Sequence, residues 1–397
     1  MKSLSAVFVL VASAAPILVA ADFPVLDSMD TLSFRLPKEK CAVELVDGKT
    51  GKAERFAFAE KCSGVFAVAK FRGTADWDRA AGISFWVKGD GSPHCGGIQL
   101  IWNDDYAVRY GYAFPIDKTE WTQVVIPWRD FVPELSNDKN KPLGPDHPPS
   151  KISAFAFGKW WYWRDYAAHS YAIADIRLES TIDTSGPDYK PVGSPLARVA
   201  EKLKTAAPVT VVTMGDSLTD FNHWANKPVN WPTLLKEKLT AKYKSAVTLV
   251  NPALGGTELR QNLVLLPHWL NSTPHPELVT ICFGGNDWNS GIRGESFRQV
   301  LTDAVDRVRR ATHGTADVLL MTTCRGLERW ETYSELAEAA RAVAKDRNTG
   351  LADIYDAFGK VDAAGREKLF CRDKTHLGPD GHELLARMVL EAIEGGH

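Results

Sequence analysis

Two patterns of hydrophobic and polar positions divide the chain. From residue 22 to about 179 the apolar residues form short alternating or β-branched runs, each bounded by Gly, Pro, Asp or Asn. These runs include GVFAVAKF (64–71), GISFWVKG (82–89), GGIQLIWN (96–103), WTQVVIPW (121–128), ISAFAFGKWWYW (152–163) and YAIADIRL (171–178). Many short strands separated by turn residues, with few helical stretches, predict a β-sandwich.

From residue 209 onward strands alternate with helices. Strands are predicted over 209–217, 246–254, 277–287, 316–324 and 351–358. Helices are predicted over 231–243, 257–270, 295–311, 333–348 and 380–394. Apolar strands interleaved with amphipathic helices indicate a three-layer α/β/α domain, in which helices cover both faces of a parallel sheet.

A linker separates the two patterns. TIDTSGPDYKPVGSP (181–195) is rich in turn-forming residues, and the residues that follow have helical spacing. We therefore predict a β-sandwich over 22–181, a linker and helix over 182–207, and an α/β domain over 208–397. A length of 397 residues also favours two domains over one.

The N-terminus predicts a secretory signal peptide over residues 1–21. Lys2 is followed by an apolar run and by the small residues Ala20 and Ala21. A membrane anchor fits less well, because the run contains Ser13 and Pro16 and is short for a span. We expect a secreted or periplasmic protein with no membrane span after cleavage.

Composition and charge change this picture in two ways. The net charge of -2 argues against a nucleic-acid partner, which would favour a basic surface.

Export permits disulfides among the six cysteines, and Cys41 with Cys62 and Cys324 with Cys371 are possible pairs, although spacing cannot settle connectivity. No cysteine pair has CxxC spacing, so we expect no zinc site. Oligomeric state and a structural calcium in the sandwich stay open.

Chemically active residues gather at the predicted strand ends. In parallel α/β sheets, reactive groups collect at the carboxyl ends of the strands. Here the first strand ends in Gly-Asp-Ser217, the second is followed by Gly255-Gly256, and the third by Gly-Gly-Asn286-Asp287. A further segment, CRDKTHLGPDGH (371–382), contributes Asp373 and His376.

These residues can form one catalytic unit. A serine hydroxyl needs a base in contact, and His376 can take the proton of Ser217. Asp373, three residues before the histidine, can hold the other ring nitrogen. The backbone N–H groups of Ser217 and Gly256 and the side-chain amide of Asn286 could then bind the oxyanion.

The order of these blocks resembles that of the SGNH hydrolase (GDSL-type esterase) superfamily. The resemblance covers 209–397 and lies in GDSLTD, NPALGGT, GGND and DKTH, which place Ser217, Gly256, Asn286 and Asp373/His376. It implies ester hydrolysis through an acyl-serine, with no metal and no organic cofactor. The glycine assignment is the weakest, because Gly255 is adjacent. No GxSxG elbow is present, which argues against the α/β-hydrolase family.

Residues near the strand ends are candidates for substrate binding. Asp216 and Asp287 are expected to be structural, by bonding backbone amides. The possible pocket residues, chosen only by their place in the sequence, are Asp220, His223, Trp288, Arg293 and Arg325.

The first half resembles the jelly rolls found as carbohydrate-binding modules. GISFWVKGDGS, WTQVVIPWRDF and YAIADIRL carry that resemblance. Because side chains of a strand alternate between its faces, we expect one or two of Trp160, Trp161 and Trp163 to be exposed. The sandwich either binds glycan or packs on the hydrolase and shapes one wall of its cleft.

The sequence thus predicts an exported serine esterase that removes acyl groups, foremost acetyl, from an acylated carbohydrate. The acetyl preference follows from export and the sandwich, since the fold supports other acyl groups. The alternatives are a lipase, lysophospholipase or thioesterase with the same triad, and a glycan-binding protein without activity. A structural surface protein fits least, because the chain has no repeats or low-complexity stalk.

Overall fold

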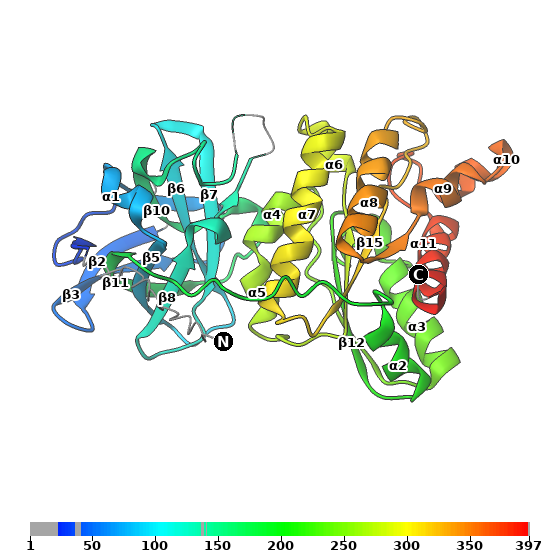
Figure 1. Ribbon diagram of the computed structural model, residues 1–397, viewed down its shortest axis with the longest axis horizontal. Coiled ribbons are helices and arrows are strands. Elements are labelled where there is room, and N and C mark those ends of the chain that lie inside the picture. The colour runs from blue at the N-terminus through cyan, green and yellow to red at the C-terminus, as the bar shows by residue number, and fades with distance from the viewer. Residues whose placement is uncertain (1–22, 36–40, 136–138, 140, 396–397) are drawn as a thin grey trace, which may run out of the picture.

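A computed structural model describes residues 23–35, 41–135, 139 and 141–395 of the chain. A β-sandwich and an α/β domain lie side by side along its longest axis (Figure 1). The predicted signal peptide, residues 1–21, lies outside the described residues. Within the described ranges, no helix combines the length and the apolar character that a bilayer crossing requires.

The N-terminal domain consists of two antiparallel sheets. One has the order β2-β3-β11-β5-β8, with β1 paired to β11, and the other has the order β4-β10-β6-β7-β9. The strands are β1 (Val25–Asp27), β2 (Cys41–Asp47), β3 (Lys52–Phe58), β4 (Val65–Lys70), β5 (Gly82–Gly89), β6 (Cys95–Trp102), β7 (Asp105–Pro115), β8 (Thr122–Pro127), β9 (Val132–Pro133), β10 (Ile152–Lys159) and β11 (His169–Glu179). The predicted β-sandwich is confirmed.

Aromatic side chains fill the space between these sheets. Phe85 of β5 contacts Phe114 of β7 and Phe157 of β10 edge to face, with ring centroids 5.2 and 5.3 Å apart. Alternate residues of each strand point into this core, as a two-layer sandwich requires. The short helix α1 (Ala75–Arg79) closes one end, with Trp77 buried.

The C-terminal domain contains a five-stranded sheet of order β13-β12-β14-β15-β16, in which every pair is parallel. Its strands are β12 (Val209–Gly215), β13 (Val247–Val250), β14 (Leu278–Cys282), β15 (Asp317–Met321) and β16 (Gly350–Ala352). Its helices are α2 (Ala197–Lys204), α3 (Trp231–Tyr243), α4 (Leu259–Val264), α5 (Leu266–Leu270), α6 (Gly285–Asn289), α7 (Gly294–Ala311), α8 (Ser334–Arg347), α9 (Ile354–Gly359), α10 (Ala363–Arg366) and α11 (Pro379–Gly395).

Helices cover both faces of this sheet, which confirms the predicted three-layer domain. Val211 of β12 faces α2, α3 and α11, and its neighbour Val212 faces α4, α7 and α8. A strand buried on both faces is apolar throughout, which explains the continuous VTVVTM run. Several predicted boundaries were wrong. The strands predicted over 246–254, 277–287 and 316–324 end at Val250, Cys282 and Met321, and Gly285–Asn289 is helix α6. Helix 257–270 is split at Leu265, next to Pro267, and the predicted strand 351–358 is strand only to Ala352 and then helix α9.

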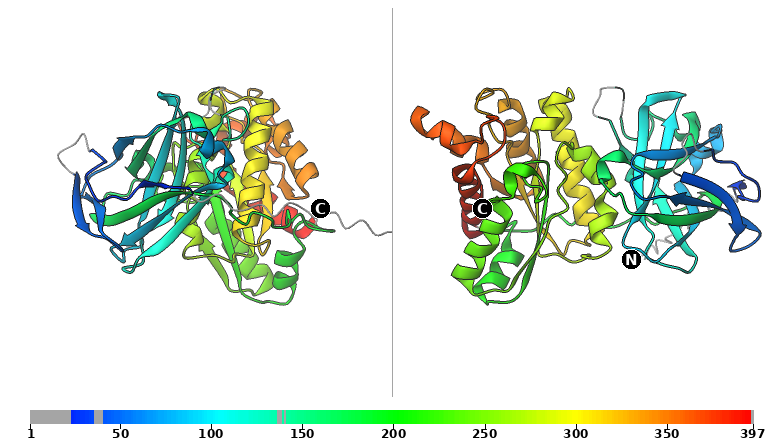
Figure 2. Two further views of the ribbon diagram at one scale, coloured as in Figure 1. Left: turned by 60° about the vertical axis from the view of Figure 1, so that its left-hand side comes forward. Right: turned by 180° about the vertical axis from the view of Figure 1, so that it is seen from behind.

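The two domains share a hydrophobic core. Trp160, Tyr162 and Trp163, which follow β10, are buried together with Leu263 and Val264 of α4. The Trp160 ring lies flat on the outer face of the second sheet because Gly97 and Gly111 leave room there: a Cβ on either would come within 2.8 Å of the indole. Figures 1 and 2 show α4, α5 and α7 between the parallel sheet of the α/β domain and the sandwich.

Polar contacts reinforce this interface. The buried guanidinium of Arg307 in α7 donates to the carbonyls of Arg129 and Asp130 at 2.7 and 2.6 Å. Arg260 of α4 donates to the carbonyl of Leu135 at 2.5 Å. The sandwich is therefore packed on the α/β domain.

One expected cysteine pair, Cys41 and Cys62, is brought into contact, but the structure has no disulfide bond between the two residues. The sulfur atoms of Cys41 and Cys62 lie 2.8 Å apart. The expected partnership of Cys324 with Cys371 is not found: the Cys324 thiol shares a hydrogen bond with Cys282, and the Cys371 thiol donates to the carbonyl of Leu377 at 3.2 Å. Cys282 is the last residue of β14, and Cys324 comes shortly after the end of β15. The two thiols meet because β14 and β15 are neighbours in the sheet.

Candidate active site

Ser217, His376 and Asp373 form one hydrogen-bonded chain. His376 Nε2 lies 3.0 Å from Ser217 Oγ, and His376 Nδ1 lies 2.5 Å from Asp373 Oδ2. These are the distances that proton transfer from a nucleophilic serine to an oriented imidazole requires. The structure therefore brings together the three residues that the sequence singled out, although they come from opposite ends of the domain.

The turn that carries Ser217 is held by buried polar groups. Asp216 Oδ1 accepts the N–H of Leu218 at 3.0 Å, and Asn226 Nδ2 donates to the carbonyls of Ser217 and Asp220, both at 2.7 Å. Burial raises the pKa of Asp216 to about 6. Asn226 was missed by sequence reasoning, because nothing in the pattern WAN marks it as a support for a turn nine residues earlier.

A second tight turn presents His376. Asp373 Oδ1 accepts the backbone N–H groups of Thr375 and His376 at 3.1 and 3.0 Å, which leaves Oδ2 for the imidazole. Burial tends to raise the pKa of Asp373, but the hydrogen bonds from His376 and Thr375 outweigh it, and the pKa lies below its ordinary value. Asp373 is therefore a carboxylate at neutral pH, which favours a proton on His376 Nδ1.

The structure distinguishes the two glycines of the second block. The N–H of Gly255 donates to Asp220 Oδ2 at 2.8 Å, whereas the N–H of Gly256 has no hydrogen-bond acceptor among the described residues. Gly256 has φ +80°, and a Cβ there would meet open space. The pair lies against Ser217, because a Cβ on Gly255 would be 3.4 Å from Ser217 Cβ. Gly256, and not Gly255, therefore has a backbone N–H that is available to an oxyanion.

Asn286 lies across the same site, in the first turn of α6. Its Nδ2 donates to the carbonyl of Thr257 at 3.0 Å and lies 3.4 Å from Asp216 Oδ2. The second contact is long, so one amide hydrogen is weakly held and is the one that can turn to an oxyanion. The backbone N–H of Ser217 likewise has no acceptor among the described residues.

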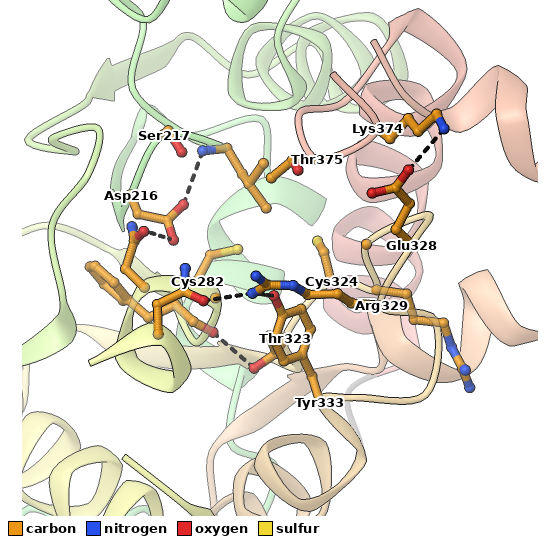
Figure 3. A pocket seen from close by; sticks show the side chains of 17 residues that line it. Asp216, Ser217, Cys282, Thr323, Cys324, Glu328, Arg329, Tyr333, Lys374 and Thr375 are labelled. Atoms are coloured by element: carbon orange, nitrogen blue, oxygen red, sulfur yellow. Dashed lines mark hydrogen bonds and ion pairs between the residues drawn. The ribbon is translucent and has the colours of Figure 1, made fainter. Parts of the chain in front are cut away.

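A cavity of about 230 Å³ opens beside Ser217. Figure 3 shows Ser217 and Thr375 at one side of it, Tyr333 at another, and the ion pair of Lys374 with Glu328, 2.8 Å long, near its rim. The lining is mixed. Its polar and charged residues are Asp216, Ser217, Asn286, Asn289, Thr323, Arg325, Glu328, Arg329, Tyr333, Lys374 and Thr375, and Leu218, Cys282, Phe283 and Cys324 contribute apolar surface. Thr323 follows β15 and could have been found by the strand-end rule, but Arg329 and Tyr333 lie in a loop without a sequence signal.

Four of the five candidate pocket residues, Asp220, Trp288, Arg293 and Arg325, are placed differently from one another. Only Arg325 lines this cavity, and its guanidinium is engaged by the carbonyls of Tyr355 and Trp330 at 2.9 and 2.7 Å. Asp220 is buried and holds Gly255. Trp288 and Arg293 stack on each other, with the guanidinium 3.7 Å from the ring centroid, and do not line the cavity.

Two aromatic side chains, His223 and Trp224, contact the ring of His376. The ring of His223 stacks on that of His376, and Trp224, 56% exposed, contacts it edge to face with centroids 5.6 Å apart. Of the three tryptophans after β10, Trp161 is exposed and Trp160 and Trp163 are buried, so one of the three is exposed as expected. Strand alternation is not the reason, because Trp161–Trp163 forms a short 3-10 helix in which Tyr162 and Trp163 are both buried.

One group in the sandwich has the side chains of a metal site. The ligand atoms of His94, Asp165 and His169 lie within 4.8 Å of one another. However, the two imidazole rings are stacked at 22°, so one ion cannot lie in both ring planes, and buried Lys159 donates to the Asp165 carbonyl at 2.8 Å. A cation there would also face this ammonium group. The cluster fits a metal poorly.

Comparison with known proteins identifies both domains. Residues 213–384 match the model of the GDSL-like Lipase/Acylhydrolase family, and residues 33–146 match that of the Carbohydrate binding domain (family 11). Within the C-terminal domain, residues 213–384 thus form a GDSL-like lipase/acylhydrolase domain. The N-terminal domain is a family 11 carbohydrate binding domain, so both family resemblances are confirmed.

Three individual proteins illustrate these likenesses. Mannan endo-1,4-beta-mannosidase of Bifidobacterium adolescentis is 33% identical over 152 residues, which are 36% of this chain but only 15% of that protein. The lipase/acylhydrolase structure from Enterococcus faecalis is 23% identical, covers 47% of this chain and 96% of its own, and has a TM-score of 0.41. The family 11 carbohydrate-binding module of Clostridium thermocellum, solved with a β-1,3-1,4-mixed-linked tetrasaccharide, is 19% identical and covers 40% and 95%, with a TM-score of 0.34.

Proposed function

We propose that the protein is a serine esterase that removes acetyl groups from a polysaccharide or oligosaccharide. The observation that carries this proposal is the hydrogen-bonded chain Ser217–His376–Asp373 beside free N–H groups of Ser217 and Gly256. A nucleophile, a base, a group that orients the base, and oxyanion donors are the parts that acyl transfer needs.

The reaction runs in two halves. Ser217 Oγ attacks the acyl carbon and gives its proton to His376 Nε2, and the oxyanion is held by the N–H groups of Ser217 and Gly256 and by Asn286 Nδ2. The C–O bond to the sugar then breaks, and His376 returns the proton to the leaving hydroxyl. Water, deprotonated by His376, attacks the acetyl-Ser217 ester, and the proton goes back to Ser217 as acetate leaves.

The polarity of the site supports a short acyl group on a sugar. A long alkyl chain would need an apolar pocket, whereas the cavity beside Ser217 contains Glu328, Arg329 and Lys374. The exposed indole of Trp224 lies next to His376 and offers a flat apolar face of the kind on which sugar rings pack. The carbohydrate binding domain adjoins this site directly.

The test compares acyl chain lengths and acceptors. The purified full chain, with Ser217→Ala beside it, is assayed on p-nitrophenyl acetate, butyrate and octanoate and on acetylated xylan and mannan. We expect acetate release that disappears in Ser217→Ala but not in Ser272→Ala, a matched change on the turn after α5. Labelling of Ser217 by a fluorophosphonate, located by mass spectrometry, tests the nucleophile without a substrate.

The other readings predict different results. A lipase or thioesterase would prefer octanoate over acetate. A glycan-binding protein without activity would bind acetylated or plain glycan, turn over none of the esters and leave Ser217 unlabelled. Either result would contradict the proposed esterase.

A further inference from the structure

One residue of the carbohydrate binding domain reaches the oxyanion loop of the hydrolase domain. Arg164 ends the short helical turn Trp161–Trp163 with a left-handed backbone, φ +52°, and its side chain leaves the sandwich. Its Nη2 donates to the carbonyl of Gly255 at 2.6 Å, and its Nη1 lies 3.5 Å from Asp220 Oδ2. The buried side chains of Trp160, Tyr162 and Trp163 anchor this turn in the shared core.

The bonded carbonyl belongs to the same peptide group as the candidate oxyanion donor. Gly255 C=O and Gly256 N–H are the two ends of one planar peptide, and in a trans peptide they point in opposite directions. A bond that fixes the carbonyl therefore fixes the direction of the N–H. Two glycines in succession have little conformational preference of their own, so the loop needs such an external restraint.

Asp220 completes the restraint from the other side. Its Oδ2 accepts the Gly255 N–H at 2.8 Å and also attracts Arg164. Asp220 thus holds the peptide group that precedes Gly255, and Arg164 holds the peptide group that joins Gly255 to Gly256. The guanidinium also polarises the Gly255–Gly256 amide, which makes its N–H a stronger donor.

We propose that Arg164 is a positioning residue for the oxyanion hole, supplied to the hydrolase domain by the carbohydrate binding domain. This inference rests on the proposed esterase function. Arg164 itself touches neither the nucleophile nor the base; it acts through the peptide of Gly256. The carbohydrate binding domain is, on this view, part of the catalytic unit and more than a means of attachment to substrate.

The experiment measures kcat and KM of the full chain on p-nitrophenyl acetate for wild type, Arg164→Ala and Arg164→Lys. Because loss of a whole oxyanion donor costs about 100- to 1000-fold, loss of its orientation is expected to lower kcat by roughly 10- to 100-fold, with KM within about twofold. Lys keeps the charge and one donor, so it should retain more activity than Ala. Added guanidinium, well below unfolding concentrations, should partly restore Arg164→Ala, because the Arg164 side chain is 43% exposed and the space it leaves can be reached from solvent.

A second arginine provides the matched control. Arg310 Nη2 bonds Asp130 Oδ1 across the same domain interface at 3.2 Å, away from the site. Arg310→Ala should leave kcat within about twofold and should not respond to guanidinium, since a surface ion pair contributes about 1 kcal/mol or less.

The outcomes separate the two proposals. A wild type that neither turns over the ester nor reacts with fluorophosphonate would overturn the esterase, and the role of Arg164 with it. An active wild type with an unimpaired Arg164→Ala would overturn only the role of Arg164. A loss of kcat that guanidinium and Lys both fail to restore, together with a lowered unfolding temperature, would make Arg164 a residue of the interface alone.

Discussion

The imidazole ring of His223 lies nearly parallel to that of His376, with 4.2 Å between ring centroids and 29° between ring planes. Burial lowers the pKa of His223, and a positive charge on His376 lowers it further. In the proposed mechanism His376 is an imidazolium while the oxyanion exists. A neutral His223 can remain stacked against that cation without repelling it.

We therefore expect the ring of His223, and not its protonation, to matter for activity. His223→Phe keeps a flat ring on His376 and should retain kcat within about threefold at neutral pH, whereas His223→Ala removes this restraint and should lower kcat by roughly tenfold. Initial rates on p-nitrophenyl acetate decide between them. Equal losses in the two variants would show that a nitrogen of His223 is needed, for example Nδ1, which accepts the N–H of Ala225 at 3.4 Å.

Trp224 is expected to serve the sugar and not the chemical step. Its indole is 56% exposed and adjoins His376, where the leaving sugar must lie. Trp224→Ala should raise KM for an acetylated oligosaccharide by about tenfold, the equivalent of 1.4 kcal/mol, because stacking area is lost. The constants for p-nitrophenyl acetate should change little, and Trp224→Phe should be intermediate. A parallel loss on both substrates would argue that Trp224 only supports His376.

Much of this site could be predicted from the sequence, because the fold obeys a strong local rule. Each strand of the sheet is an apolar run that ends abruptly in small polar residues, and parallel strands bring those ends to one edge. Ser217, Asn286 and the glycine pair are near each other for that reason. His376 and Asp373 do not end a strand of the sheet. They were predicted from the resemblance of DKTH to the last block of the family, and their three-residue separation permits the turn that joins them.

The parts that could not be predicted depend on contacts between distant segments. Arg164 comes from the other domain, and the only sign of its role is a hydrogen bond to Gly255. The same contact network decides between Gly255 and Gly256, which sequence left open. Trp288 and Arg293 were chosen because they follow a strand end, but the Arg293 guanidinium stacks on the Trp288 ring. Proximity in sequence to a strand end does not say which way a side chain points.

The stability of the domain should depend on pH through Asp287. Burial raises the pKa of Asp287 to about 8, and the negative charges of Glu258 and Asp216 contribute. The folded state therefore keeps a proton that the unfolded chain releases near pH 4. Its contribution to the free energy of unfolding is full below pH 4 and is lost as pH rises to about 8.

Asp287→Asn, which resembles the protonated acid, should remove the loss of unfolding free energy that Asp287 causes as pH rises. Urea unfolding between pH 4 and 9 should show no difference from wild type at pH 4 and an increasing advantage of the variant toward pH 8. Asn can still accept the N–H of Leu259, which Asp287 Oδ1 accepts at 3.1 Å. Asp380→Asn, at an exposed position in the first turn of α11, is the control. A constant difference at every pH would show that Asp287 is ionised in the folded protein.

The shared core predicts that the two domains unfold together and that Trp160 couples them. Trp160 is 3% exposed, lies over Gly97 and Gly111, and contacts Phe66 and Trp163 with ring centroids 4.9 Å away in each case. Truncation of such a side chain costs about 3–5 kcal/mol, because the cavity cannot close against two glycines and a sheet. Trp160→Ala should therefore lower the unfolding temperature and split one calorimetric transition into two.

The neighbouring Trp161 is the control, because its truncation removes the same side chain from an exposed position. Trp161 is 61% exposed, so Trp161→Ala should change the free energy of unfolding by about 0.5 kcal/mol or less and leave a single transition. Trp160→Ala should also lower kcat, because the turn that it anchors carries Arg164, whereas Trp161→Ala should not. Two transitions already present in wild type would show that the domains are independent. The hydrolase would then need no support from the carbohydrate binding domain, and the loss of kcat in Trp160→Ala would not occur.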